Sequence, residues 1–256
     1  MKSRHGSDDG PPITLSEQDG VRYLHFGSEW VQGAMKIRQP DRIVLDYVRQ
    51  MMGWMLFLQA PREILQLGLG AGALTRFCLK HLADTRVTTV ELSAQVIRAA
   101  ERWFALPTTD PRLTLVTADA HDFLMRAGVA GRFGIVQVDL YDLHARGPVL
   151  DSVRFYRACR RALTDTGLCV VNLFGEHASF ERNLRNLDQA FGGRLLLLPP
   201  GAAGNRVVLA FQGPPLRVAW ERLAQRADLL DRRFGFEAPD WVQGLRAQHG
   251  GSACTV

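Results

Sequence analysis

The sequence predicts an α/β protein whose core is a doubly wound sheet with helices on both faces. Three observations predict it: short apolar runs alternate with segments of helical spacing, a glycine-rich turn follows the first of these runs, and acidic residues follow the later ones. The chain has 256 residues, of which 46% are hydrophobic and 22% are charged, an ordinary globular composition. We therefore expect one main domain with a small appendage.

The segment 62–91 is the unit around which the rest is organised. An apolar run at 64–67 is expected to be a strand, residues 73–82 have helical spacing, and a β-branched run at 87–90 is expected to be the next strand. Three glycines lie between the first strand and the helix: Gly68, Gly70 and Gly72. The second strand ends in an acid, Glu91.

This combination is typical of a nucleoside site. Glycines let a ligand approach the backbone and the amino end of the helix, which a side chain would prevent. Glu91 lies about 20 residues past the glycines, where it would offer two acceptor oxygens to a pair of ribose hydroxyls. The alternative is a tight βα turn in which the acid only caps the helix after Leu92.

Before this unit we expect a tail and a small β appendage. Residues 1–20 have no apolar signal core and are expected to be a flexible cytoplasmic tail. Residues 21–38 contain short β-rich runs separated by glycines, which predicts a small N-terminal β hairpin region. Pro40 and Asp41 are typical of a helix start, so one helix is expected to reach Leu58.

After residue 91 the alternation continues. The expected helices are 94–104, 121–127, 151–163 and 179–191, and the expected strands are 113–116, 133–138, 168–173, 195–198 and 206–211. Gly167 is expected to terminate the third helix, and the last two strands to form a hairpin. A Rossmann-like nucleoside-binding domain therefore spans 39–213. Residues 214–256 form a C-terminal helical segment, whose apolar face suits packing on the sheet or on another subunit.

Four residues follow consecutive expected strands: Gly68, Glu91, Asp119 and Asp139. In a doubly wound sheet, ligands bind beyond the carboxyl ends of the strands. These four residues are therefore expected to converge on one site, which is stronger support for a ligand site than any single motif.

Composition and spacing exclude several other classes. No apolar run reaches the roughly 18 residues of a membrane span. Four cysteines without CxxC or CxxH spacing, and histidines spread over separate loops (His121, His144 and His177), predict buried thiols in a reducing compartment and no metal. The net charge is +5, but no dense basic block with interleaved aromatics is present, so we expect no nucleic-acid partner.

Several of these segments resemble the spermidine synthase family of polyamine aminopropyltransferases, in a divergent branch. They are ILQLGLGAG, VTTVEL, DPRLTLVTADAHDFL, FGIVQVDLYD and, upstream, LHFGSEWVQGAM, and the resemblance covers residues 21–211. The family shares its sheet with class I S-adenosylmethionine-dependent methyltransferases. The resemblance implies a small-molecule amine acceptor and a homodimer. The co-substrate it implies is decarboxylated S-adenosylmethionine, with S-adenosylmethionine as the alternative.

The resemblance also implies roles for individual residues. The donor-binding positions are Gln32, Gly68, Gly70, Gly72, Glu91, Leu92, Asp119 and Ala120. Of these, the glycines would lie against the sulfur end of the nucleoside, and Asp119 would accept from the adenine amino group. Asp139 and Asp142 match the two acids of the D-x-x-D segment and are the expected catalytic residues. A carboxylate is needed there because a polyamine nitrogen is protonated at neutral pH and must lose a proton before it attacks.

The chain departs from the family in the half of the site that binds the amine. Ala71 replaces the acid of the G-G-G-D-G loop, and Val48 stands at the position of a family tyrosine, with Tyr47 one residue away. Asn172 is expected either to face the site or to cap a strand end. Because an aspartate at position 71 would repel a carboxylate, methyl transfer from S-adenosylmethionine is an alternative. A non-catalytic nucleoside-binding relative is a third possibility.

Overall fold

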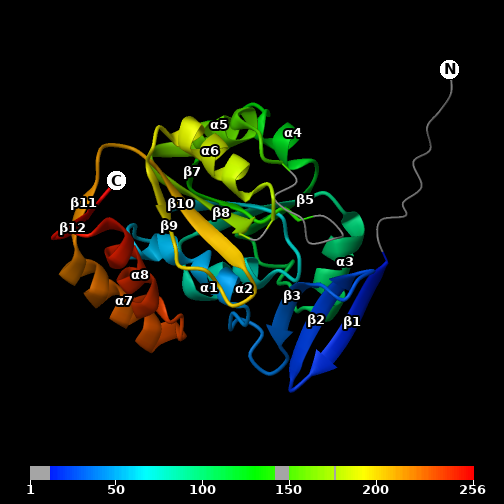
Figure 1. Cartoon of the computed structure of the whole chain (residues 1–256). Coiled ribbons are helices and arrows are strands. Elements are labelled where there is room, and N and C mark those ends of the chain that lie inside the picture. Colours follow the sequence, from blue (N-terminus) through cyan, green and yellow to red (C-terminus); the bar gives the residue numbers. More distant parts are fainter. Residues whose placement is uncertain (1–11, 142–149, 176) are drawn as a thin grey trace.

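A seven-stranded sheet forms the centre of the protein (Figure 1), as seen in a computed structural model that describes residues 12–141, 150–175 and 177–256. Its strands are β4 (Glu63–Leu67), β5 (Arg86–Glu91), β6 (Leu113–Thr117), β7 (Phe133–Val138), β8 (Leu163–Phe174), β9 (Leu195–Leu197) and β10 (Asn205–Gln212). Their order is β6-β5-β4-β7-β8-β10-β9, and β10 runs antiparallel to the other six strands. The order reverses between β4 and β7, the place where such sheets bind ligands.

Helices cover both faces of the sheet, as predicted (Figure 1). They are α1 (Asp46–Gln50), the 3-10 helix η1 (Gly53–Leu56), α2 (Ala73–His81), α3 (Ala94–Trp103), α4 (Ala120–Leu124), α5 (Val153–Ala162), α6 (Phe180–Phe191), α7 (Trp220–Phe234) and α8 (Ala238–His249). Alternate strand residues face opposite sides. Ile64 and Ile135 therefore pack with α1, α2, α7 and α8, whereas Leu65 and Val136 pack with α4, α5 and α6.

The small N-terminal sheet has three strands, β1 (Ile13–Gln18), β2 (Val21–Phe26) and β3 (Val31–Lys36). The prediction of a flexible tail over residues 1–20 is therefore wrong for residues 13–18. Asp19 and Gly20 both have positive φ, which is the two-residue Asp-Gly turn that favours a hairpin. The strand before that turn is largely exposed, and its apolar alternation stops after Ile13 and Leu15, which is too short to predict a strand.

The single helix expected from Asp41 to Leu58 is also wrong, because the segment is broken into α1 and η1. Met51, Met52, Trp54 and Leu56 are all completely buried, so the segment has no solvent-facing side and cannot be one amphipathic helix. At the break, Gly53 lies against the side chain of Leu198, where an added Cβ would be 3.0 Å from Cδ1.

Two other expectations near the sheet differ in detail. Helix α5 ends at Ala162, and Leu163 already belongs to β8, so Gly167 lies inside that strand and does not terminate the helix. A Cβ at Gly167 would lie 3.0 Å from the carbonyl oxygen of Gly134 on the neighbouring strand, which explains the need for a glycine there. The predicted hairpin is confirmed, because β9 and β10 pair antiparallel.

The C-terminal segment is helical as predicted, and it packs on the sheet. Trp220, Leu223, Ala227 and Leu230 of α7 are buried in the same cluster as Phe211 of β10. A short two-stranded sheet, β11 (Arg217–Ala219) with β12 (Ala253–Thr255), ties the two ends of this segment together and was not predicted. Among the described residues, no helix has the length and hydropathy required to span a membrane.

The N-terminal sheet is joined to the glycine loop by a close backbone contact. A Cβ at Gly33 of β3 would lie 2.5 Å from the Cβ of Ala71, and Ala71 is only 2% exposed. The two segments therefore approach each other as closely as they do because position 33 has no side chain. This contact holds β3, and the neighbouring Gln32, against the carboxyl edge of the sheet.

We expect Gly33→Ala to destabilise the protein by about 1–3 kcal/mol, because the added methyl group overpacks this contact. Gly201→Ala is the matched control, since Gly201 also has an ordinary φ and its added Cβ would meet only the Asn205 carbonyl oxygen, at 3.6 Å. Urea unfolding of both variants measures the difference. Equal midpoints would contradict the proposed tight contact.

Candidate active site

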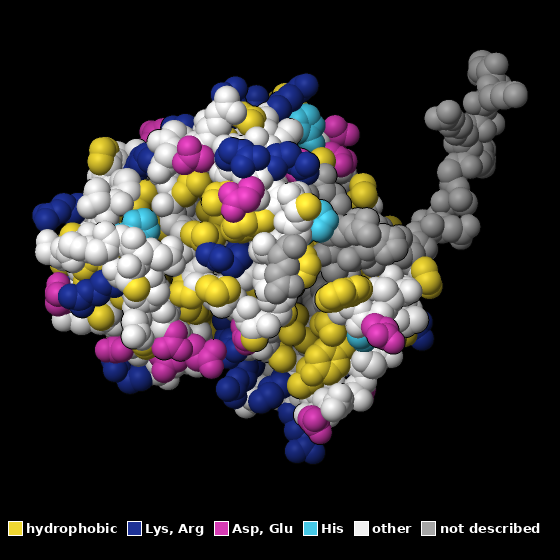
Figure 2. Space-filling view, in the orientation of Figure 1, with side chains coloured by type: hydrophobic (Ala, Val, Ile, Leu, Met, Phe, Trp, Pro, Cys, Tyr) yellow, Lys and Arg dark blue, Asp and Glu magenta, His cyan; other side chains and the backbone are white. Residues whose placement is uncertain are grey.

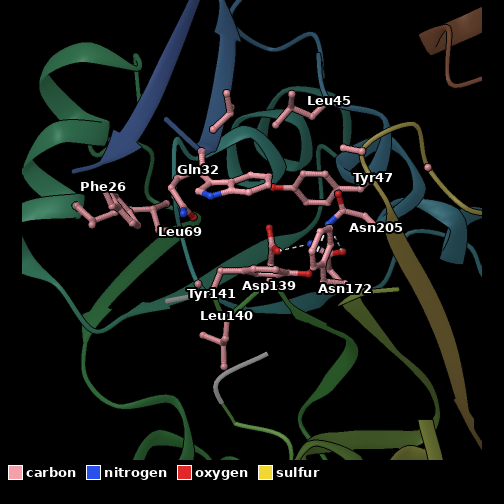
Figure 3. Close-up of a pocket in the computed structure, with 18 of the residues that line it drawn as sticks. Phe26, Gln32, Leu45, Tyr47, Leu69, Asp139, Leu140, Tyr141, Asn172 and Asn205 are labelled. Carbon is pink, nitrogen blue, oxygen red and sulfur yellow. Dashed lines mark hydrogen bonds between the residues drawn. The ribbon is translucent and has the colours of Figure 1, made fainter. Parts of the chain in front are cut away.

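A cavity of about 840 Å³ opens at the carboxyl edge of the sheet, where the strand order reverses. Its walls come from the glycine loop after β4, the ends of β5, β7 and β8, helix α1, the N-terminal sheet and the β9–β10 loop (Figure 3). The convergence predicted for the strand ends is therefore confirmed for Gly68, Glu91 and Asp139, which all line this cavity.

The glycine loop forms one wall of the cavity through Gly68 and Gly70. Both have positive φ, at 96° and 50°. A Cβ at Gly68 would overlap the backbone carbonyl of Asp139, and a Cβ at Gly70 would lie 2.9 Å from the carbonyl oxygen of Gln32. Gly72 is different, because it caps α2 and faces Leu106 and Arg76 outside the cavity lining. Gly72 therefore shapes the turn before α2 and does not contribute to the cavity wall.

The Glu91 carboxylate bridges the glycine loop and the start of α3. Its Oε2 accepts from the backbone N–H of Leu69 at 3.0 Å, and its Oε1 accepts from the backbone N–H of Ser93 at 2.9 Å. Burial raises the pKa of Glu91, and the backbone hydrogen bonds from Ser93 and Leu69 oppose that rise. Each carboxylate oxygen has a second lone pair, so both remain able to accept from a ligand hydroxyl.

The alternative role of Glu91, an acid that only caps the next helix, accounts for one of its two carboxylate oxygens, because Oε1 holds the N–H at the start of α3 while Oε2 holds the glycine loop. The cap of α3 is Ser93, whose hydroxyl accepts from the N–H of Val96 at 3.4 Å. Gln32 and the exposed Leu92, two of the expected donor-binding residues, also line the cavity. Gln32, Gly68, Gly70, Glu91, Leu92 and Asp139 are therefore brought together in one place.

Asp119 and Ala120 do not line the cavity described here. They follow β6, the edge strand, and the Asp119 carboxylate caps α4 by accepting from the N–H of Asp122 at 3.0 Å. Asp119, His121 and Asp122 also bring three potential metal ligand atoms within 4.8 Å of one another. Exposed acidic groups of this kind are common without an ion, so the expectation that the protein uses no metal stays a prediction.

Asp139 is the buried acid of the site. Its Oδ1 accepts from the amide Nδ2 of Asn172 at 2.9 Å, and its carboxylate also accepts a hydrogen bond from the Tyr47 hydroxyl. Burial raises the pKa of Asp139 to about 6, although the hydrogen bonds from Asn172 and Tyr47 lower it. Burial and the neighbouring Asp139 raise the pKa of Tyr47 well above its ordinary value, so this hydroxyl is a donor. A carboxyl poised near neutral pH suits general base catalysis.

Polar side chains from four segments surround Asp139 (Figure 3). Asn205 of β10 donates to Oδ1 of Asn172 at 3.0 Å and lies 3.5 Å from the Tyr141 hydroxyl. Asn172 thus faces the site, which settles the two roles expected for it. Tyr47, Tyr141 and Asn205 were not predicted as site residues. Asp142, the second expected catalytic acid, and His144 lie outside the described residues.

In α1 it is Tyr47, and not Val48, that faces the site. Alignment to the family motif places Val48 at the tyrosine position, but Val48 is buried in the core and Tyr47 lines the cavity. Successive helix positions point about 100° apart, so a shift of one residue decides which side chain faces the site. The signal available in the sequence was the tyrosine at position 47, one residue before the aligned position.

Aromatic side chains form the outer part of the cavity. Trp30, from the β2–β3 loop, meets Phe174 at the end of β8 edge-on, with ring centroids 6.5 Å apart. Trp30 is 56% exposed, and Figure 2 shows hydrophobic side chains gathered on the surface over the N-terminal sheet. The small sheet therefore contributes an apolar rim as well as Gln32 to the mouth of the cavity.

The charge of the cavity lining is one-sided. Among the described residues that line it there is no lysine or arginine, whereas four are acidic: Glu29, Asp46, Glu91 and Asp139. Asp46 is partly neutralised because it pairs with Arg49 beside the cavity. Ala71 does not line the large cavity, but it lines a small adjoining cavity of about 30 Å³ together with Tyr47 and Asp139, to which its methyl group brings no charge.

The raised pKa of Asp139 predicts a stability cost at neutral pH. Its folded-state pKa of about 6 lies above the ordinary 3.8, so the folded protein binds the proton more tightly, and stability falls as the pH rises from about 4 to about 6. The difference corresponds to about 3 kcal/mol. We expect Asp139→Asn to be more stable than the wild type at pH 8, by up to that amount, and equally stable at pH 4. Thermal unfolding at both pH values tests this, and a pH-independent difference would contradict it.

The model of the spermine/spermidine synthase domain family matches residues 41–193. A polyamine aminopropyltransferase of Neisseria meningitidis serogroup A is 35% identical over 240 residues, which cover 93% of this chain and 90% of that protein. Two solved structures share the fold at 19% identity. A probable spermidine synthase from Corynebacterium glutamicum has a TM-score of 0.71 and covers 94% of this chain and 91% of its own. A spermidine synthase bound to the transition-state analogue AdoDATO has a TM-score of 0.65 and covers 91% and 84%.

The family model matches more than half of the chain, and the similarity to the Neisseria enzyme extends over nearly all of it. The sequence motifs, the doubly wound sheet and the cavity at its carboxyl edge agree with that match. The chain therefore belongs to the spermine/spermidine synthase family and is a transferase.

Proposed function

We propose that the protein transfers an aminopropyl group from decarboxylated S-adenosylmethionine to a small polyamine-type amine. The observation that carries this is the buried Asp139 carboxyl, held by Tyr47 and Asn172 in the same cavity as the glycine loop and Glu91. The cavity thus combines a nucleoside-binding edge with a base poised near neutral pH. The curated relatives are named polyamine aminopropyltransferases, which agrees with this chemistry.

The proposed reaction needs one proton transfer and one displacement. The acceptor ammonium gives a proton to the Asp139 carboxylate, and the freed nitrogen lone pair attacks the methylene carbon next to the donor sulfonium. A carbon–nitrogen bond forms as the carbon–sulfur bond breaks, and the sulfur keeps its electron pair as methylthioadenosine leaves. The protein holds the two partners in line, with Glu91 on the ribose and Gly68 and Gly70 against the sulfur end.

The charge of the lining favours the decarboxylated donor over S-adenosylmethionine. The donor carboxylate that decarboxylation removes would face Glu29, Asp46 and Asp139, with no lysine or arginine among the described lining residues to pair with it. An aminopropyl ammonium and an amine acceptor are cations and suit the same walls. This favours aminopropyl transfer over methyl transfer, although Ala71 replaces the family acid.

The remaining family properties are part of the same proposal. We expect Asp142 to contribute to holding the amine, and we expect the protein to be a cytoplasmic homodimer; these stay predictions from the sequence resemblance. A non-catalytic nucleoside-binding relative would bind methylthioadenosine but would release none from the decarboxylated donor with any amine.

Glu91 provides the test of the nucleoside site. We expect Glu91→Gln to weaken methylthioadenosine binding by about 10- to 100-fold, because the ribose would lose hydrogen bonds to a charged acceptor, worth about 1.5–3 kcal/mol. Isothermal titration calorimetry gives the Kd. Ser93→Ala is the control, since it removes the α3 cap beside Glu91 but leaves the carboxylate in place. Unchanged affinity in Glu91→Gln would remove Glu91 from the ribose role.

The reaction itself is tested by methylthioadenosine release. We expect release from the decarboxylated donor in the presence of putrescine or a longer polyamine, and none from S-adenosylmethionine. The rate should rise with pH through about 6, because Asp139 must be a carboxylate to take the proton. Asp139→Asn should lower kcat by on the order of 100-fold or more. Wild-type rates in that variant would exclude Asp139 as the base.

A further inference from the structure

Two glutamines lie in the middle of the sheet, where strands normally carry apolar residues. Gln66 of β4 and Gln137 of β7 are each 1% exposed and are direct neighbours in the parallel register. Gln137 lies two residues before Asp139, so both side chains point to the same face of the sheet, the face covered by α1. Gln137 does not line the cavity, and so it has no direct contact with a substrate there.

The hydrogen bonds of these glutamines run in one direction. The hydroxyls of Thr75 and Thr89 donate to Oε1 of Gln66, at 2.6 and 3.1 Å. Gln66 Nε2 donates to Oε1 of Gln137 at 3.0 Å, and Gln137 Nε2 donates to the backbone carbonyl of Met51 at 2.9 Å. Because each amide oxygen already accepts, each amide nitrogen must point onward, and the chain of donors ends on α1.

Met51 is the C-cap of α1 and completes a closed ring of contacts. Its N–H donates to the carbonyl of Tyr47 at 2.8 Å, which makes one helical turn, and the Tyr47 hydroxyl donates to Asp139. Alternate residues of β7 are about 6.6 Å apart and one turn of helix rises about 5.4 Å, so the two elements are nearly matched in length. One turn of α1 is thus attached to Gln137 at its end and to Asp139 at its start.

Helix α1 needs such an attachment. It has only five residues, and its first residue is preceded by Leu45, which makes no side-chain cap. A helix this short is not stable by itself in water, so contacts with the rest of the protein determine its position. The bond from Gln137 to the Met51 carbonyl is a direct hydrogen bond from the sheet to the end of this helix, in addition to the bond from Gln50 to Pro199.

We propose that Gln137 is a positioning residue for aminopropyl transfer: by holding the Met51 carbonyl, it fixes the turn of α1 that places the Tyr47 hydroxyl on Asp139. Gln66 donates to the oxygen of the same amide but makes no hydrogen bond to α1, and the Met51 carbonyl, which can only accept, is enough to keep the Gln137 nitrogen pointed toward the helix. The kinetic part of this inference rests on the proposed function, whereas its structural part does not.

The matched variants are Gln137→Met and Gln66→Met. Both make the same swap at neighbouring buried positions, but only Gln137 donates to α1. We expect Gln137→Met to lower kcat by about 10-fold or more, with the donor KM within about 2-fold, since a displaced hydroxyl misorients the base. The rise of rate with pH should move to higher pH, because the Tyr47 hydrogen bond lowers the pKa of Asp139. Gln66→Met should keep its kcat within about 3-fold and its pH profile unmoved.

A double-mutant cycle with Tyr47→Phe separates positioning from general damage. If Gln137 acts through Tyr47, adding Gln137→Met to Tyr47→Phe should change kcat by less than about 2-fold. An equal loss with and without the Tyr47 hydroxyl would overturn the proposal. If Gln137→Met does not fold, Gln137→Asn replaces it, since it keeps a polar amide at this position but is one methylene shorter, which withdraws the nitrogen from the Met51 carbonyl.

Hydrogen exchange gives a readout that does not depend on the reaction. In Gln137→Met or Gln137→Asn, the amides of residues 46–52 should exchange faster than in the wild type, and in Gln66→Met they should not. Unchanged protection in the Gln137 variants would overturn the proposal. If the wild type released no methylthioadenosine while the exchange result held, the proposed function would fail and the positioning of α1 by Gln137 would stand.

Discussion

The site depends on one buried carboxyl group, that of Asp139. Removing a carboxylate from water raises its pKa, and the hydrogen bonds from Asn172 and Tyr47 keep it low enough to ionise near neutral pH. Each donor comes from a different element, β8 and α1, and each is fixed by further contacts, with Asn205 on one side and Met51 on the other. The end of β7, the short helix α1 and the β9–β10 hairpin are therefore arranged around one titratable group.

Much of the fold could be predicted because its strands are buried on both faces. The apolar runs of β4, β5 and β7, the glycine turn and the acid at Glu91 all have strong local signals. Strand β1 had no such signal, because it is exposed and only its Asp-Gly turn marks it. The prediction for segment 41–58 was wrong for the opposite reason. Burial on every side removes the hydrophobic periodicity that would distinguish one long helix from two short ones.

The site residues divide in the same way. Gly68, Glu91 and Asp139 follow strands, so their positions come from the order of elements alone. Tyr47 depends on the exact rotation of a five-residue helix, and Asn205 depends on the register of β10 against β8, where it opposes Phe174. Asn172 and Asn205 form a hydrogen bond although they are 33 residues apart in the sequence. No local sequence pattern specifies the register of two strands that are so far apart. The side chains around Asp139 are brought together by such long-range contacts, and the sequence resemblance predicts that this is the half of the site that binds the amine.

The glutamine pair shows why a polar network is tolerated in the sheet of this protein. A buried amide without hydrogen-bond partners destabilises a protein. In Gln66 and Gln137, however, the amide oxygen accepts a hydrogen bond and the amide nitrogen donates one. Gln50, the last residue of α1, has no partner for its Oε1 among the described residues, although its Nε2 donates to the carbonyl of Pro199. An apolar pair would pack the strands equally well but would hold the Met51 carbonyl only by shape. The hydrogen bond from Gln137 to the Met51 carbonyl fixes the end of α1. Because α1 is too short to hold its own position, this bond is what keeps the Tyr47 hydroxyl against the Asp139 base.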